Sequence, residues 1–211
     1  MDKDGLLKSI AEMGYNVGFG AKKHFATYDI VQKVPGAIGF VSMAIGIFAL
    51  IFEPLSAKLP SACLVVAGVL ALYISFFDHC KGDYEEGGRK LTVLYNRLRD
   101  LYRDVQSGID VTAAHASLKS IESEYYAVGV SNQIVGSDWY AHYKFFAQMQ
   151  HDWIDEQKRF TWRDKVPLSF RAWIILLIIG GAGWAAGALF FYPRSTRPRR
   201  AKAVFPDMVR V

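Results

Sequence analysis

The sequence predicts an all-α integral membrane protein with a transmembrane helical hairpin, a cytoplasmic helical bundle and a third, C-terminal transmembrane helix. Three uncharged apolar stretches, helical spacing of apolar residues between them, and the lack of a convincing alternating strand pattern lead to this prediction. Hydrophobic residues make up 52% of the 211 residues and the net charge is only +5, which excludes a mainly disordered chain. The apolar residues are also bunched, which argues against an ordinary soluble domain.

The uncharged stretches are long enough to cross a bilayer. They cover residues 34–52, 59–77 and 172–193. At about 1.5 Å per residue, the shorter two span roughly 28 Å, close to the thickness of the hydrocarbon core. Because lipid offers the backbone no hydrogen bonds, each stretch is predicted to be a helix. The alternative, a buried core helix of a soluble protein, is disfavoured by the length and the absence of charge.

The loop between the first two spans is short enough to dictate topology. Residues 53–58 join them, so the two helices form an antiparallel hairpin and their outer ends lie on one side of the membrane. Twelve Lys and Arg residues flank the spans on that side, against seven on the other, which predicts a cytoplasmic amino terminus and middle region. The basic tail, residues 194–211, counts against this orientation, since three crossings place it outside.

The segment before the first span, residues 1–33, is predicted to be an amphipathic cytoplasmic helix. Gly14, Gly18 and Gly20 interrupt it, each at a cost of about 1 kcal/mol relative to Ala. Two interpretations stay open: close approach of another helix, or a ligand or partner backbone lying against the glycines. Residues 18–23 lack the spacing of a phosphate-binding loop, so a nucleotide site is not favoured.

Residues 79–168 are predicted to form a cytoplasmic helical bundle of three helices. The first carries a heptad seam over residues 83–106, ended by Ser107-Gly108. Asp110 or Thr112 caps the second helix, and residues 129–136 form a loop. Ser137 then caps a long helix that reaches about Arg163. The apolar positions that carry these predictions are Leu91, Leu94, Tyr95, Leu98, Leu101, Tyr102 and Val105 in the first helix, Leu118, Ile121, Tyr125 and Val128 in the second, and Phe146, Trp153 and Phe160 in the third.

No enzyme signature is present among these residues. The five His residues form no metal-binding motif, and the two Cys residues cannot supply a four-thiolate zinc site. His79-Cys80 beside Asp78 and Asp83 is read as a polar turn at the membrane exit rather than a metal site. The acidic cluster of Asp152, Asp155 and Glu156 is read as a solvated face with ion pairs to following basic residues. No catalytic, metal-binding or cofactor-binding residue is therefore expected.

The spans instead carry small residues on roughly one face each. Such faces let helices approach closely in lipid, so these residues are candidates for helix packing or for facing a pore. No span contains an internal ionisable residue, which argues against active transport. The candidates are Gly36, Gly39, Ser42 and Gly46 in the first span, Gly68, Ala71 and Ser75 in the second, and Gly180, Gly183 and Gly187 in the third.

The net charge comes entirely from the carboxyl-terminal tail. Residues 194–211 hold six basic residues against one acidic residue, and the rest of the chain is neutral. This distribution is not that of a nucleic-acid-binding domain, so direct nucleic-acid binding is not expected. If the tail were cytoplasmic, it would be suited to anionic membrane lipid.

The order of these segments resembles a known family. The residues that carry the resemblance lie in 6–15, 18–29, 91–98 and 138–143, with the hydrophobic hairpin between the second and third of these. In this order they are similar to the SLATT domain, a two-span effector associated with SMODS nucleotidyltransferases and SLOG sensors. The resemblance implies a homo-oligomeric, pore-forming effector of antiphage defence in the bacterial inner membrane. Its partner would be a nucleotidyltransferase, a reverse transcriptase or a SLOG-type sensor. The segment 169–193 departs from the two-span plan.

Three functional hypotheses follow. The first is a membrane effector that couples a signal to permeability. The second is a non-conducting membrane anchor or scaffold that recruits a cytoplasmic partner. The third, an enzyme or nucleotide receptor using residues 14–23, is the least favoured because no motif supports it.

Overall fold

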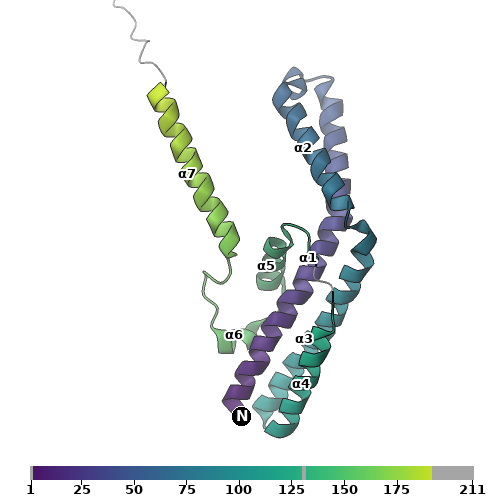
Figure 1. Ribbon diagram of the computed structural model, residues 1–211, viewed down its shortest axis with the longest axis vertical. Coiled ribbons are helices and arrows are strands. Elements are labelled where there is room, and N and C mark those ends of the chain that lie inside the picture. Colours follow the sequence, from purple (N-terminus) through teal and green to yellow (C-terminus); the bar gives the residue numbers. More distant parts are fainter. Residues whose placement is uncertain (1, 130–131, 192–211) are drawn as a thin grey trace, which may run out of the picture. The chain divides into compact units, whose positions relative to one another are not determined.

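The computed structural model describes residues 2–129 and 132–191, and every regular element in this part of the chain is helical (Figure 1). The all-α prediction is confirmed. The helices are α1 (Lys3–Ala49), α2 (Lys58–Ser75), α3 (Lys81–Ser107), α4 (Val111–Tyr126), α5 (Ser137–Gln148), α6 (Asp152–Lys158) and α7 (Leu168–Phe191), with short 3-10 turns η1 (Glu53–Ser56) and η2 (Asp78–Cys80). Two compact units result, one comprising α1 to α6 and the other α7.

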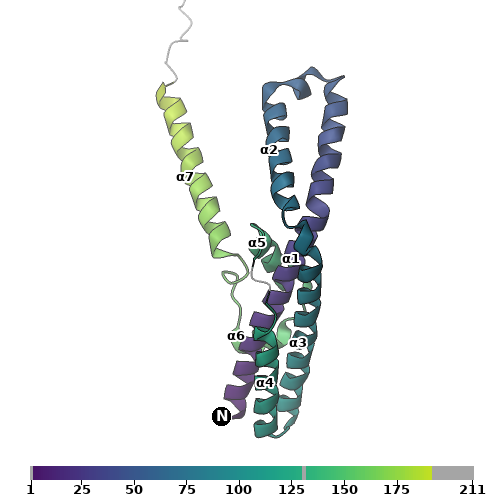
Figure 2. The same cartoon turned by 45° about the vertical axis from the view of Figure 1, so that its right-hand side comes forward.

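The amphipathic amino-terminal segment and the first span form one continuous helix, α1. Asp2 caps it by accepting a hydrogen bond from the Gly5 amide at 3.0 Å. Its 47 residues correspond to about 70 Å of helix, and the helix continues through Pro35 although proline cannot donate a backbone hydrogen bond. The half before Pro35 runs beside α3 and the half after it runs beside α2 (Figure 2). A single continuous helix therefore joins the bundle to the membrane hairpin.

The predicted hairpin is present. Helix α2 returns along the second half of α1 after the turn η1, and its bounds lie within two residues of the predicted second span. Large apolar side chains on both helices are exposed, as in Phe40, Val65 and Leu72. Helices α1, α2 and α7 are each long and apolar enough to cross a membrane. These exposed apolar surfaces are therefore the ones that face lipid in a membrane protein.

The core of the bundle lies between the first half of α1 and helices α3 to α6. The α3 seam predicted from the heptads is buried, including Leu98 and Tyr102. Leu6, Ile10 and Val17 of α1 pack against it in the same cluster. The bundle thus has five helical contributors, α1 and α3 to α6, where three helices are predicted from residues 79–168 alone.

The two predicted helix boundaries around residue 109 are confirmed. Gly108 ends α3 with φ of 102°, a left-handed conformation that glycine adopts without strain. Asp110 caps α4, since its carboxylate accepts a hydrogen bond from the Ala113 amide at 3.0 Å. The stripe of α4 also faces the core, with Leu118 and Ile121 buried.

The predicted long helix from Ser137 to Arg163 is wrong. The residue that caps α5 is Gly136, with φ of 89°, and Ser137 is buried as the first helical residue. The helix stops at Gln148 because Met149 is extended, and α6 starts only at Asp152. The break lets the hydroxyl of Tyr95 donate to the Gln150 carbonyl at 2.5 Å and brings the next turn onto α1. Tertiary contacts of α6 therefore override the seven-residue spacing.

Helix α7, taken by itself, is a largely apolar helix whose residues are exposed from 172 to 186. It begins at Leu168 and covers most of the predicted third span, residues 169–193. The last two residues of that span and the basic tail, residues 194–211, lie outside the described residues.

Candidate functional site at the membrane hairpin and its junction with the bundle

A small apolar cluster closes the junction between hairpin and bundle. Val31 of α1 and Ile74 of α2 pack with Ile134, which lies in the segment between α4 and α5. All three side chains are buried. The segment before α5 therefore touches both membrane helices at the point where they meet the bundle.

Polar contacts tie the same segment to α1 and α3. The Thr27 hydroxyl donates to Gln133 Oε1 at 2.5 Å, and the Tyr84 hydroxyl donates to the Asn132 carbonyl. With Ile134, these contacts fix three consecutive residues against the three helices α1, α2 and α3. Residues 132–134 are held in place even though they have no regular secondary structure.

A charged group beside this cluster links α1 to α5. Asp29 of α1 pairs with Lys144 of α5 and with Lys33 one turn along α1, the latter at 2.5 Å. Lys144 is nine-tenths buried, and its ammonium lies 4.7 Å from the centre of the Tyr140 ring. Burial alone raises the pKa of Asp29, but hydrogen bonds from Lys144 and Lys33 outweigh it and hold the pKa below its ordinary value. We name Asp29, Lys33 and Lys144 the junction latch, because it fastens α5 to α1 next to the first span.

The glycines of the first half of α1 are covered by aromatic rings. A Cβ added at Gly14 would lie 2.2 Å from the Trp153 indole, and one at Gly18 would lie 2.8 Å from the Tyr95 ring. These contacts support the interpretation of close packing, since the chain itself occupies the space that a ligand would need. The partners are side chains of α3 and α6 rather than a second glycine-lined helix.

A second pair of glycines escaped the sequence reasoning. Gly87 and Gly88 of α3 admit His24 and Phe25 of α1, at 2.9 and 3.0 Å from the Cβ that each glycine lacks. Two adjacent glycines within a heptad helix lower its stability relative to alanine. Their presence in the sequence could therefore have indicated a close approach by another helix. Gly87 and Gly88 allow α1 and α3 to approach closely on the bundle side of the junction.

The small residues predicted on the spans lie on open faces. A Cβ added at any glycine of the spans meets no heavy atom within 4 Å among the described residues, and on the first two spans Ser42 and Ala71 are half-buried and Ser75 is exposed. The candidate glycines of the two hairpin helices therefore have open space beside them among the described residues. The glycines concerned are Gly36, Gly39, Gly46 and Gly68 on the hairpin, and Gly180, Gly183 and Gly187 on α7.

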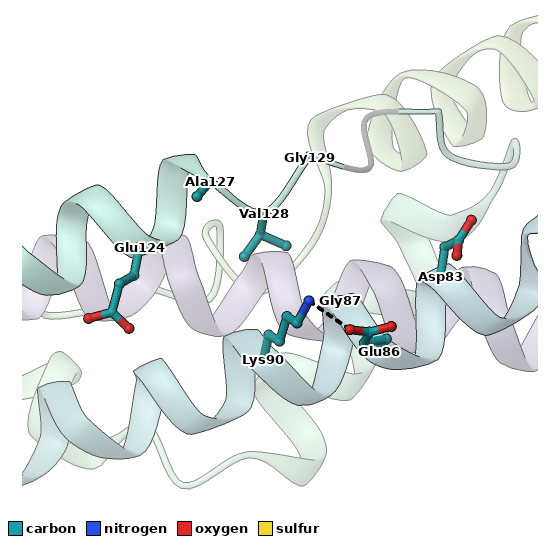
Figure 3. Close-up of a pocket in the computed structure, with 8 residues that line it drawn as sticks. All are labelled: Asp83, Glu86, Gly87, Lys90, Glu124, Ala127, Val128 and Gly129. Carbon is teal, nitrogen blue, oxygen red and sulfur yellow. Dashed lines mark ion pairs between the residues drawn. The ribbon is translucent and has the colours of Figure 1, made fainter.

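A recess of about 350 Å³ lies between α3 and the end of α4 (Figure 3). Asp83, Glu86 and Glu124 contribute carboxylates to its wall, and Lys90 contributes the one cation, which is paired with Glu86 at 2.7 Å. The excess of negative charge disfavours an anionic nucleotide in this recess.

The other polar candidates serve the packing of the bundle. Asp155 accepts a hydrogen bond from the Phe160 amide at 2.6 Å, and Glu156 accepts one from the Tyr102 hydroxyl at 2.8 Å. In the described part of the chain, no group of three or more His, Cys, Asp or Glu residues is placed to hold a metal ion. His24 is buried, and its Nδ1 has no hydrogen-bond partner in the same residues. Burial, with Lys23 nearby, lowers the pKa of this imidazole.

One comparison with known proteins identifies a match. The sequence profile of the family described as SMODS and SLOG-associating 2TM effector domain 6 matches residues 1–174. This range covers the hairpin and the whole bundle and ends within the first two turns of α7. No curated protein and no solved structure matches the chain.

Proposed function

Because the chain belongs to the SMODS and SLOG-associating 2TM effector domain family, we propose that it oligomerises in the bacterial inner membrane and permeabilises it when a partner delivers a signal to the bundle. The bundle then lies in the cytoplasm, as the distribution of Lys and Arg favours. The partner is of the kind that the family description names, a SMODS-associated nucleotidyltransferase or a SLOG-type sensor, with a reverse transcriptase as a further candidate.

The continuous helix α1 is the observation that carries this proposal. One half of α1 forms the core of the bundle with Leu6, Ile10 and Val17, and the other half is the first membrane span. A rotation or tilt of the bundle half is transmitted to the span because no loop separates them. A simple membrane anchor has no need for such coupling.

The open faces of the spans support oligomerisation. Two or three helices cannot enclose an aqueous channel, so permeabilisation needs membrane helices from several chains. Gly36, Gly39 and Gly46 have room for a neighbouring helix, and small residues allow helix backbones to approach closely in lipid. The spans contain no Asp, Glu, His, Lys or Arg over residues 34–52 or 59–77, so the assembled pathway conducts passively rather than pumps.

Depolarisation of cells that overproduce the chain tests the proposal. A potential-sensitive dye is expected to report loss of membrane potential before growth stops, and purified chain is expected to release dye from liposomes at a high protein-to-lipid ratio. Gly39→Leu and Gly68→Leu should reduce release at least tenfold, since leucine fills the small faces at positions where an added Cβ meets no atom within 4 Å. Val65→Leu, on an exposed apolar position, is the matched control and should behave as the parent.

The opposite outcome supports the membrane anchor. If liposomes stay tight at every protein-to-lipid ratio, and growth arrest occurs with an intact potential, the chain recruits a partner to the membrane and conducts nothing.

A further inference from the structure

A line of exposed apolar side chains begins directly after the fixed segment at the junction. Trp139 and Tyr143 are four residues apart and lie on one face of α5, and Val135 lies in the turn that leads into the helix. Val135 is 82% exposed and Tyr143 is 59% exposed, which is unusual for apolar and aromatic side chains in an otherwise well-packed bundle. The opposite face of α5 carries the buried residues Ala141 and Phe145.

The exposure of this face is built into the fold. Asn132, Gln133 and Ile134 are each held by a contact to α3, α1 or the hairpin, so the next residue, Val135, cannot turn inward. Gly136 then takes a left-handed conformation that sets the direction of α5. The latch residue Lys144 holds the other end of the helix. We name Val135, Trp139 and Tyr143 the α5 face.

The position of the α5 face along α1 coincides with the edge of the membrane. Ile134 packs on Val31, which precedes the first residue of the uncharged span, Val34, by three residues or about 5 Å of helix. It also packs on Ile74, which lies inside the second span. The interfacial layer on each side of the hydrocarbon core is about 5–7 Å thick. The α5 face therefore starts at the level of the lipid headgroups.

Its chemistry also fits that layer. Tryptophan and tyrosine are enriched at membrane interfaces because each has an apolar body and a polar group that stays hydrated. The Tyr143 and Tyr140 rings stack with centroids 6.4 Å apart, which broadens the aromatic surface. Charges at the same level are neutralised in pairs, Lys33 with Asp29 at 2.5 Å and Lys81 with Asp78 at 3.0 Å.

We propose that the α5 face is an interfacial anchor that inserts into the headgroup and upper acyl region of the bilayer that holds the hairpin. This inference goes beyond permeabilisation, because it assigns a membrane contact to a helix that crosses nothing. Its occupant is lipid, since Ile134, the residue before Val135, packs on both membrane helices near the ends of the uncharged spans, which places the start of the face at the edge of the bilayer. The anchor fixes the bundle against the membrane surface, so a signal must lift or rotate α5 together with α1.

Nitroxide depth measurements in proteoliposomes test the proposal. The full chain with Cys63→Ala and Cys80→Ala receives a single labelled cysteine, by Val135→Cys or Tyr143→Cys, both at exposed positions. Phe40→Cys marks the hydrocarbon core. Ser107→Cys marks water, because Ser107 is exposed and lies 23 residues, or about 35 Å of helix, beyond Tyr84 on α3.

The readout is the ratio of collision with oxygen, which concentrates in lipid, to collision with a water-soluble nickel chelate. Labels at positions 135 and 143 are expected to give ratios at least threefold above that of position 107 and below that of position 40. A ratio at position 135 equal to that at position 107 would overturn the anchor. Dipolar broadening with low oxygen access would also overturn it and assign the face to a second copy of the chain. The ratio does not depend on conductance, so failure of the anchor and failure of permeabilisation are separate results.

Discussion

A clash-and-relief experiment on Gly14 and Trp153 tests the packing that joins α6 to α1. The ideal Cβ at position 14 lies 2.2 Å from Trp153 Cη2, and the indole is held by a hydrogen bond to the Tyr95 hydroxyl at 3.1 Å. A ring in that position cannot yield as a flexible side chain would. Gly14→Ala should therefore destabilise the bundle by about 1–3 kcal/mol through overpacking, partly offset by about 1 kcal/mol of helix propensity.

Removing the ring should reverse the sign of the effect. Trp153→Ala alone should cost about 3–5 kcal/mol, because the indole is more than nine-tenths buried. In that background Gly14→Ala no longer meets the indole, so it should be neutral or stabilise the bundle by up to about 1 kcal/mol. The two sites are then coupled by about 1–3 kcal/mol, well outside the additivity expected for independent sites.

Hydrogen exchange of α1 and α6 amides in the full chain, in detergent, measures the local free energy of opening for the four members of the cycle. Gly20→Ala is the matched control on the same helix, because its Cβ lies 3.4 Å from Leu91, an ordinary contact. It should stabilise the helix by about 0.5–1 kcal/mol. If Gly14→Ala stabilises the parent as Gly20→Ala does, or is equally harmful without Trp153, the assigned packing is wrong.

Three further predictions concern the junction and the loop before α5. Lys144→Met leaves Asp29 with the exposed Lys33 as its partner in the latch and should increase exchange of α5 amides at least tenfold. The double variant Lys144→Met/Asp29→Asn should recover most of the protection, since a mostly buried carboxylate that has lost its buried partner costs more than a missing pair. His24 has a lowered pKa in the fold, so as the pH falls the unfolded chain binds a proton at this residue before the folded chain does. Thermal unfolding should therefore show stability falling below about pH 6.5, by at most about 1.4 kcal/mol per pH unit. His24→Gln should flatten that pH dependence. Gly136→Ala should lower stability by about 1 kcal/mol because φ at this position is 89°. Gly82→Ala, in an open position within α3, should leave stability unchanged or raise it slightly in the same thermal assay, because alanine favours the helix.

The features that were predictable from the sequence depend on local pattern. The spans follow from length and absence of charge, the α3 seam from heptad spacing, and the ends of α3 and α4 from Gly108 and Asp110. Each of these signals acts within a few turns of helix. The order of the segments along the chain likewise predicted membership in a two-span effector family, and the family match over residues 1–174 confirms it.

The features that only the tertiary structure decided join residues far apart in the chain. The break between α5 and α6 depends on Tyr95 and Trp153, the junction latch joins Asp29 to Lys144, and Gly87 matters because His24 lies against it. The small residues of the spans also could not be interpreted from the sequence alone. Periodicity places Gly39 and Gly68 each on one face of a helix but does not determine which helix or lipid contacts that face. Local periodicity determines which elements form, whereas the energy of a particular side-chain contact depends on which elements are brought together.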